Sequence, residues 1–539
     1  YNGLYQKGPF LIGDIHTQDI NEDGEYWWVR GTNLGLESRY FRLESGTQGK
    51  TDFFFEFDQQ PNYINNTGET PYLSPGNTQL LLPPGYIYPD INSILNPLEL
   101  STERPRVGAG LDIKLKNYWS FDVAFRHENK DGIDKTGSSV ASPTSTSGVV
   151  RLVTGALIPE PIDYETNTVN AAFRYAKDKA QFAIGYQGST FKNANESLLW
   201  QDFYRTTQFG SQSLPPDNQM HQLSLSGGYQ MTREYNLTGM LSVGHASQDQ
   251  TFQPYGVNGF GGPLPRDSLD GEVTQTNAQI KFRYRPSRKF RLNAEYRYDD
   301  RSNDTPVADW NGVVADGNQT YDYENNPESY THNQFDLIGN WHIGSITNLR
   351  VGYQYDLMYR EFASLVEQYN FDTQENKLFA KLKMQPGLAW NLALFGEAGD
   401  RNLNNFELPS DRATGIIPFN VADRQHGQLG ALVEYMPSNS WNFGARVEYN
   451  KDEYNEAQLG LVEAETPSFT LDASYHPNKD VSTYVYYTRE EMKSSQKGRS
   501  TTAGTVATPA WNADFDDSID TIGLGGKIAG MGKWDMGLD

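Results

Sequence analysis

One stretch of the chain alternates apolar and polar residues on both sides of a central break. It reads GQLGALVEYMPSNSWNFGARVEYN, residues 427–450, and the break is Pro437-Ser438-Asn439. Successive side chains on a strand point to opposite faces, so this alternation predicts a β-hairpin with one apolar and one polar face. A soluble sandwich hides its apolar face in a core, whereas a membrane barrel shows that face to lipid and its polar face to a lumen.

The hydropathy of the chain favours strands over helices as the way to cross a membrane. No run approaches the roughly 18 consecutive apolar residues of a transmembrane helix. The mean hydropathy of -0.67 is still compatible with a membrane protein, because a barrel strand needs only every second residue to be apolar. The 539 residues also show no linker or change of composition that would divide them into several soluble domains.

Cysteine count and net charge exclude several functions. With 0 Cys, the chain has no disulfide, no thiolate metal site and no CxxCH motif for covalent haem attachment. We therefore expect no covalently bound cofactor. The net charge of -23 argues against nucleic acid as a partner, since phosphate binding requires clustered Lys and Arg.

Paired strands joined by short turns alternate with long polar loops along the chain. The long loops cover residues 59–104, 129–166 and 192–220, and several short turns contain proline. This alternation is typical of an up-and-down antiparallel barrel in the outer membrane of a Gram-negative bacterium, with short turns periplasmic and long loops extracellular. Besides the opening hairpin, the predicted pairs are 107–115 with 119–126, 169–175 with 181–188, 221–231 with 235–244, 278–285 with 289–298, 335–343 with 349–359, 378–384 with 390–397, 468–475 with 481–487, and 521–528 with 534–538.

The predicted domain plan is simple. Residues 1–24 form an irregular periplasmic lead-in, and residues 25–539 form the barrel, beginning with strands at 25–33, 38–45 and 51–57. The count of about 21 strands is odd, whereas bacterial single-chain barrels have even numbers, so we expect a chain that is incomplete at its C-terminus and a full barrel of about 26 strands. Its lumen would be wider than that of porins with about 16 to 18 strands.

Charged residues concentrate on one face of the predicted strands. Such a density of charge cannot line a dry core, because each unpaired buried ion costs several kcal/mol. It can line water or a polar protein partner. A soluble β-solenoid is disfavoured because the spacings are irregular. The predicted lumen-facing partner contacts are Lys281, Arg283, Arg285, Arg291, Glu295, Arg297, Glu434, Arg446 and Glu448.

Metal-binding and catalytic patterns are sparse. Asp19, Asn21 and Asp23, followed by Gly24, match the opening of a calcium loop, although an EF-hand is excluded because Arg30 stands where the bidentate Glu belongs. A simpler calcium loop competes there with a solvated acidic turn. The 8 His are scattered without ligand spacing, which disfavours haem ligation. No catalytic motif stands out, so we expect a protein that is not an enzyme.

Four segments resemble one known family. Residues 25–64, EYWWVRGTNLGLESRYFRLESGTQGKTDFFFEFDQQPNYI, resemble the N-terminal signature of the MtrB/PioB family of decahaem-cytochrome-associated outer-membrane β-barrels. The segments LIPEPIDYETNTVNAAFRY (157–175), IGYQGSTFKN (184–193) and DNQMHQLSLSGGYQ (217–230) are similar to later family motifs in the same order. The chain departs from the family in lacking the N-terminal CxxC of some members, which puts any thiol role in doubt.

The resemblance implies a sheath for electron transfer. Such a barrel holds a periplasmic multihaem cytochrome of the decahaem type in its lumen and is commonly capped at the long loops by an extracellular multihaem cytochrome, so that haem is carried by the partners. Outer-membrane lipid would cover its outside. A water-filled general or solute-specific porin is the alternative, and a hydrolase embedded in a barrel is the third class.

Overall fold

The computed structural model describes most of the chain. The described residues are 9, 11–88, 90–141, 153–258, 262–315, 319–362, 369–406, 417–454, 459–498, 511–531 and 534–538. Within them the chain forms strands and one 3-10 turn, η1 (Ile91–Ser93). No helix in this part of the chain is both long and apolar enough to span a membrane.

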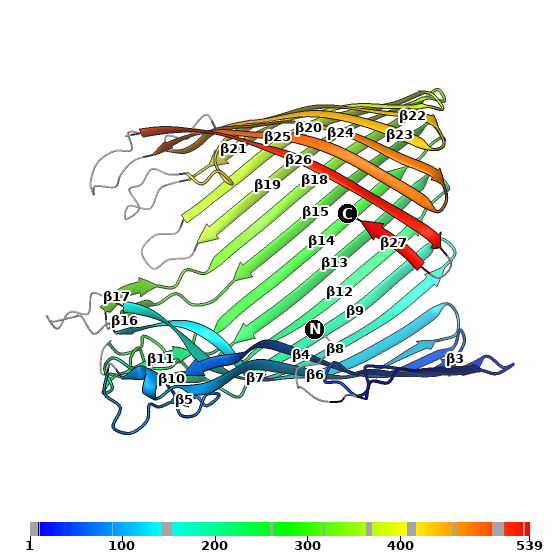
Figure 1. The fold of residues 1–539 in the computed structure, drawn as a ribbon. Coiled ribbons are helices and arrows are strands. Elements are labelled where there is room, and N and C mark those ends of the chain that lie inside the picture. Colours follow the sequence, from blue (N-terminus) through cyan, green and yellow to red (C-terminus); the bar gives the residue numbers. More distant parts are fainter. Residues whose placement is uncertain are drawn as a thin grey trace.

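A single antiparallel sheet of 22 strands makes up the body of the protein (Figure 1). Each strand pairs with its neighbour in the chain, which confirms the predicted all-β, up-and-down architecture. The sheet is strongly curved. Its strands are β1 (Ile15–Ile20), β2 (Glu25–Thr32), β3 (Tyr40–Thr47), β4 (Thr51–Thr70), β6 (Asn96–Lys114), β7 (Trp119–Ala141), β8 (Val153–Lys177), β9 (Ala180–Asn193), β12 (Asn218–Gln230), β13 (Tyr235–Gln248), β14 (Gly271–Tyr284), β15 (Phe290–Asn303), β18 (Glu328–Ile343), β19 (Thr347–Phe362), β20 (Tyr369–Gly387), β21 (Trp390–Asn404), β22 (Arg424–Ser438), β23 (Trp441–Glu453), β24 (Gly460–Asn478), β25 (Val481–Gly498), β26 (Trp511–Met531) and β27 (Trp534–Leu538).

Among the described residues, the short turns lie at one end of the sheet and the long connections at the other, on the right and left of Figure 1. We call these the short-turn end and the long-loop end. The β14–β15 turn, for example, occupies only residues 285–289, while residues 304–327 connect β15 to β18. The alternation of short and long connections inferred from the sequence is therefore confirmed.

Two expectations need correction. The predicted lead-in at residues 1–24 is not wholly irregular, because Ile15–Ile20 forms β1 and pairs with β2, which brings the sheet to 22 strands, in agreement with the predicted count of about 21. The long loops are also shorter than predicted, since β4 extends to Thr70 and β6 begins at Asn96. Ladder hydrogen bonds join backbones, so polar residues prolong a strand where the apolar alternation has stopped.

The two faces of the sheet differ in chemistry. Directly paired residues share a face, so the register carries the apolar face from strand to strand: Leu225 pairs with Leu241, which pairs with Ala278. This outer face exposes large apolar side chains such as Leu429 (70% exposed) and Ile522 (76% exposed). Soluble proteins rarely expose apolar patches of this extent, so a nonpolar solvent is the expected surrounding.

Aromatic rings border the outer face near the short-turn end. Trp441 packs against Tyr475 in a tilted arrangement with ring centroids 4.3 Å apart, and Trp390 packs against Tyr435 in the same way at the same distance. Farther along β23, the outer face changes from Val447 and Tyr449 to Lys451, whose ammonium pairs with Glu465 at 3.2 Å. Apolar residues between an aromatic border and a charged border are the pattern of a bilayer-spanning band.

The long-loop end carries a small globular layer. The β4–β6 connection contributes β5 (Gln79–Leu80), and the β9–β12 connection contributes β10 (Ser197–Gln201) and β11 (Phe209–Ser213), which together form a three-stranded sheet. A second hairpin, β16 (Asp309–Ala315) with β17 (Gln319–Glu324), comes from the β15–β18 connection. The core of this layer consists of Tyr72, Leu80, Leu82, Ile158, Leu198, Trp200 and Leu214.

Candidate functional site

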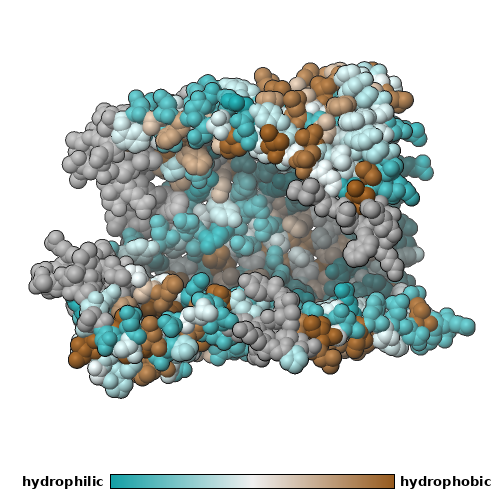
Figure 2. All heavy atoms as spheres, in the orientation of Figure 1, coloured by the Kyte–Doolittle hydropathy of each residue, from teal (hydrophilic) through white to brown (hydrophobic). Residues whose placement is uncertain are grey.

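The inner face of the sheet is the candidate functional surface. It is the face opposite the apolar band, and hydrophilic residues (teal) cover much of the hollow in Figure 2. The register joins distant inner-face residues: Arg291 pairs with Asn340, Asn340 with Arg350, and Arg350 with Lys381. Continuing along the same line, Lys381 pairs with Phe395 on β21. The predicted lumen-facing hairpins on β14–β15 and β22–β23 therefore share one continuous wall.

Ion pairs tie the first strands of this wall together. Glu56 on β4 is buried. Its carboxylate forms ion pairs with Arg42 on β3 at 3.0 Å and with Arg126 on β7 at 2.8 Å. The contact with Arg126 crosses over β6, where Gly108 occupies the position between the two side chains. A Cβ on Gly108 would lie 3.0 Å from Cγ of Glu56, so glycine leaves the room that this bridge needs. Nearby, Arg106 pairs with Glu128 at 2.6 Å.

A second group forms on the β14–β15 hairpin. Glu295 accepts a hydrogen bond from Gln279 at 2.7 Å and lies 3.5 Å from the Lys281 ammonium. Arg297 also pairs with Glu295, and donates to the amide oxygen of Gln334 at 3.2 Å. Three of the predicted lumen-facing residues, Lys281, Glu295 and Arg297, are thus one cluster on the inner face.

The β22–β23 hairpin contributes three more predicted residues. Arg446 pairs with Glu448, whose carboxylate also accepts a hydrogen bond from Gln428 at 2.6 Å. Glu434 accepts one from Asn391 at 3.2 Å. These side chains lie on the inner face, as expected. Their contact with a partner stays a prediction.

The remaining three predicted residues are cations that have no carboxylate partner among the residues described. Arg283 and Arg291 are exposed on the inner face, and within the described residues neither forms an ion pair. Arg285 lies just beyond β14 in the turn, where its backbone N–H donates to the carbonyl of Glu234 at 2.7 Å. Arg285 therefore belongs to the rim of the short-turn end rather than to the wall.

Sequence reasoning missed two parts of the wall. Glu375 and Arg424, on strands separated by β21, form a 2.6 Å ion pair, a contact that no sequence spacing indicates. Arg350, Lys381 and Lys383 share the inner face with the predicted cations. Their alternation with Leu349, Val351 and Leu382 was visible in the sequence and could have identified them.

The calcium candidate folds as a tight turn between β1 and β2. Asn21 Oδ1 accepts hydrogen bonds from the backbone N–H groups of Asp23 at 3.1 Å and Glu25 at 2.9 Å, and Gly24 adopts a φ of 76°. Asn21 is therefore engaged in closing the turn, as Asn side chains commonly are. Asp19 lies on β1, opposite Trp27. Calcium binding by Asp19, Asn21 and Asp23 stays a prediction.

No acidic or histidine cluster of the kind that holds a metal occurs in the part of the chain that the structure describes. The His side chains that have partners pair with neighbours on the sheet: His332 lies 2.8 Å from Asp356, and His426 lies 2.8 Å from Asp452. These are structural roles in the wall.

A cavity of about 550 Å³ opens in the layer at the long-loop end. It lies between the β5–β10–β11 sheet, the β13–β14 connection and the β16–β17 hairpin. Its lining is mainly apolar and includes Leu199, Phe252, Val257, Leu264, Trp310 and Tyr323. The long loops thus pack together into one folded surface with a cavity, and do not extend separately from the sheet.

The whole chain, residues 1–539, matches the family described as "outer membrane beta-barrel porin, MtrB/PioB". The chain belongs to the MtrB/PioB family. It is similar to "Outer membrane protein MtrB" of Shewanella baltica (strain OS185), with 28% identity over 531 residues that cover 95% of this chain and 72% of that protein. The resemblance seen in the sequence is confirmed.

Solved structures of outer-membrane proteins are also similar to the chain. The siderophore receptor PirA from Acinetobacter baumannii has a TM-score of 0.46 and 10% identity, covering 95% of this chain and 73% of that chain. A mutant of the ferric enterobactin receptor PfeA from Pseudomonas aeruginosa has a TM-score of 0.47 and 11% identity, covering 97% of this chain and 73% of that chain.

Family membership identifies the surroundings of the two faces. The MtrB/PioB chain is an outer-membrane β-barrel, so the apolar outer face contacts lipid and the inner face lines the lumen. The family is a porin-type family and not an enzyme family.

Proposed function

We propose that this barrel is a sheath that encloses a periplasmic multihaem c-type cytochrome, of the decahaem type, and supports electron transfer across the outer membrane. An extracellular multihaem cytochrome would exchange electrons with it at the long-loop end. In this arrangement the short turns face the periplasm and the long loops face the outside, as in other bacterial barrels.

The observation that carries the proposal is the inner wall of an MtrB/PioB barrel. The wall is polar over many strands and carries exposed charged side chains such as Arg126, Lys281 and Arg446. Hydrated charge of this kind suits contact with a folded, water-soluble protein whose surface is also polar. The name of the Shewanella relative, MtrB, accords with a role in such a conduit.

The chain itself supplies no conductor. With 0 Cys it cannot attach c-type haem through thioethers, and a β-barrel wall without a redox centre is an insulator. Electron transfer would therefore depend on haems carried by the partners. The barrel would bind the cytochrome, shield it from lipid and fix its position. In this role it would not be an enzyme.

The layer at the long-loop end supports the second contact. Its buried core fixes the β4–β6 and β9–β12 connections, and its 550 Å³ cavity gives the surface relief. A preformed, shaped surface binds a partner with less loss of conformational entropy than mobile loops would. We propose this layer as the docking surface for the extracellular cytochrome.

An open porin is the second candidate, and the description of the family as a porin favours it. The decisive experiment is to extract the protein from native outer membranes in mild detergent, purify it without added partners and record a visible spectrum beside a haem-stained gel. A stoichiometric Soret band carried by a separate polypeptide is expected for a sheath. A haem-free protein that forms large channels in planar bilayers would show that the lumen is open.

A further inference from the structure

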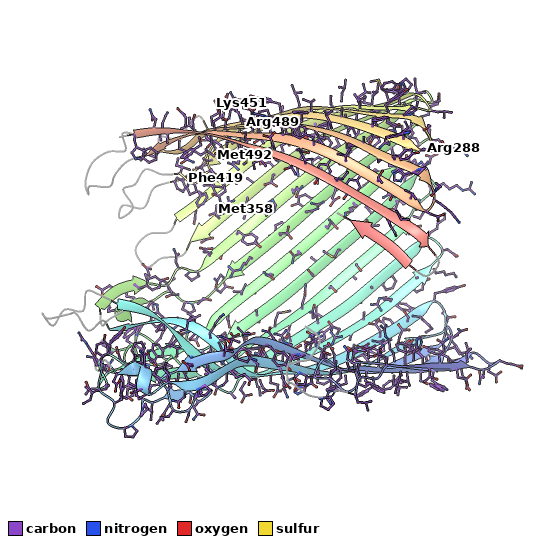
Figure 3. All side chains as sticks on the ribbon, viewed as in Figure 1. Arg288, Met358, Phe419, Lys451, Arg489 and Met492 are labelled. Atoms are coloured by element: carbon purple, nitrogen blue, oxygen red, sulfur yellow. The ribbon has the colours of Figure 1, made fainter. Side chains whose placement is uncertain are left out.

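Five cations of the inner wall have no carboxylate partner within the part of the chain that the structure describes. Arg283 lies on β14, Arg291 on β15, Arg350 on β19, and Lys381 and Lys383 on β20, all toward the short-turn end. Among the described residues, none of the five forms an ion pair or a side-chain hydrogen bond. We call these five residues the basic strip. Figure 3 labels Arg288, a further cation, which projects from the β14–β15 turn at the same end.

The register places three residues of the basic strip, Arg291, Arg350 and Lys381, along one line of the wall. Arg291, Asn340, Arg350 and Lys381 are paired in succession across four neighbouring strands. With strands about 4.8 Å apart, the line from Arg291 to Lys381 is roughly 14 Å long. Arg350 and Lys381 are directly opposite each other, an arrangement of like charges that destabilises a sheet.

Two of these cations are held by aromatic rings of the same wall. The Arg350 guanidinium lies 5.5 Å from the centroid of Phe379, and the Lys381 ammonium lies 5.2 Å from that of Phe395. A cation over a ring face is attracted by the ring quadrupole and keeps its charge. The rings therefore orient the cations without neutralising them.

Several other cations of the inner wall are neutralised by carboxylates. Arg42 and Arg126 pair with Glu56, Arg106 pairs with Glu128, and Arg424 pairs with Glu375. The chain has ample acid for this purpose, with 68 Asp and Glu against 45 Lys and Arg. The protein as a whole is acidic. A group of cations with no carboxylate partner among the described residues is therefore a basic patch on an acidic molecule.

We propose that the basic strip is the docking surface for an acidic face of the protein in the lumen. This inference rests on the proposed function, because it presupposes a protein in the lumen. The recognised groups are the Asp and Glu side chains of that protein. The cations of the basic strip from Arg291 to Lys381 are spread over roughly 14 Å and several strands. This spacing matches the surface of a protein better than it matches a single small anion. Lipid does not compete, because the basic strip lies on the face opposite the lipid-facing band.

Docking would relieve the repulsion between Arg350 and Lys381 and would be steered by charge. Complementary potentials raise association rates and fix orientation, and they weaken with salt. Outside the complex, salt screens charges that are more than about 8 Å apart, so the repulsion between the directly opposed Arg350 and Lys381 persists until a partner binds. In the complex, water is displaced from between the cations of the basic strip and the carboxylates of the partner. The electrostatic attraction between them therefore increases.

The test is charge reversal in the native complex. The variant R350E/K381E/K383E is produced in the host that carries the natural partners, extracted in mild detergent and compared with wild type by the ratio of haem to barrel. A control variant, K116E/R233E/K479E, makes the same change of charge at exposed residues of three short turns, away from the wall. Barrel folding is checked by the faster gel migration of the unheated protein.

The expected result is a roughly tenfold or greater loss of co-purified haem in the strip variant, and little loss in the control, because like-charge contacts exclude a partner. The neutral variant R350Q/K381Q/K383Q should retain haem at low salt and release it at lower salt than wild type does. It also serves as the second measurement if the reversed variant does not fold.

Two outcomes overturn different statements. If wild type carries haem and both strip variants retain it at every salt concentration that wild type tolerates, the basic strip is not the docking surface although the sheath stands. If wild type carries no haem polypeptide, the proposed function fails, and the inference fails with it.

Discussion

Arg424 and Glu375 face each other across β21 and form a 2.6 Å ion pair, although they lie on strands that are not neighbours. Between them stands Arg401, paired in register with both. The Arg401 guanidinium donates to the carbonyls of Ala422 at 2.8 Å and Phe419 at 2.6 Å. The Glu375 carboxylate thus lies close to two arginines, and one of them, Arg401, fastens the segment that leads into β22.

Glu375→Gln should loosen this segment. Without the carboxylate, Arg401 and Arg424 are like charges directly opposite each other, and both are largely buried. We expect a loss of local stability of about 1–3 kcal/mol. Hydrogen exchange of the amides at residues 417–423 should therefore become faster. Asp400→Asn, which alters an exposed carboxylate on the other face of β21, should leave this exchange unchanged; equal effects would contradict the assignment.

The lipid-facing band can be tested with two neighbouring residues. Leu225 faces outward on β12 within the apolar band, while the next residue, Ser226, is exposed on the inner face. Leu225→Arg should lower the stability of the barrel in liposomes by about 2–4 kcal/mol, because an arginine at mid-depth is exposed to hydrocarbon. Ser226→Arg adds the same group to the lumen and should cost far less. Urea titration of both variants in the same lipid gives the comparison.

The fold was largely predictable because period-two alternation survives wherever a strand crosses lipid. The hairpin at residues 427–450 appears as β22 and β23, paired from Gln425–Glu453 to Ser438–Trp441. Strand ends beyond the bilayer were not predictable, since polar residues such as those of β4 near Thr70 pair through the backbone alone. For the same reason β1 and the small sheet at the long-loop end left no periodic signal.

The inner wall was predictable in composition but not in connectivity. Alternation placed Lys281 and Arg283 on the polar face, and the structure confirms that location. It could not show that Lys281 has a carboxylate partner, Glu295, whereas Arg283 has none among the described residues. Pairing depends on register between strands, and a bridge such as Glu56 to Arg126 also depends on the small size of Gly108.

The layer at the long-loop end should unfold separately from the barrel. Leu80 is 0% exposed in its core, whereas the adjacent Leu81 is 44% exposed. Leu80→Ala should destabilise this layer by about 2–5 kcal/mol, because it removes transfer energy and leaves a cavity. Limited proteolysis should then cut within residues 71–95 while the unheated barrel still migrates as folded. Leu81→Ala is the matched control, and equal protease sensitivity of the two variants would count against the core.

The same layer should loosen at high pH because of Tyr72. Burial raises the pKa of the Tyr72 phenol above its ordinary value near 10.0, and the negative charge of Asp202 raises it further. The neutral phenol also donates to the carbonyl of Gln201 at 3.2 Å. The pKa of Tyr72 is higher in the folded state than in the unfolded state. The stabilisation that the neutral phenol gives to the layer is therefore complete below about pH 10 and declines as the pH rises above it.

Proteolysis of the long-loop layer between pH 8 and 11.5 measures this effect. Wild type should become more sensitive above about pH 10, where an unfolded tyrosine ionises. In Tyr72→Phe the layer should be less stable than in wild type at pH 8, by about 1 kcal/mol, because the hydrogen bond is lost. Its stability should then fall less than that of wild type as the pH rises. The remaining loss is assigned to Tyr86 in the same layer, because burial also raises the pKa of the Tyr86 phenol. Tyr88→Phe, at an exposed ring, should keep the wild-type profile; an unchanged profile in Tyr72→Phe would mean that another group controls the transition.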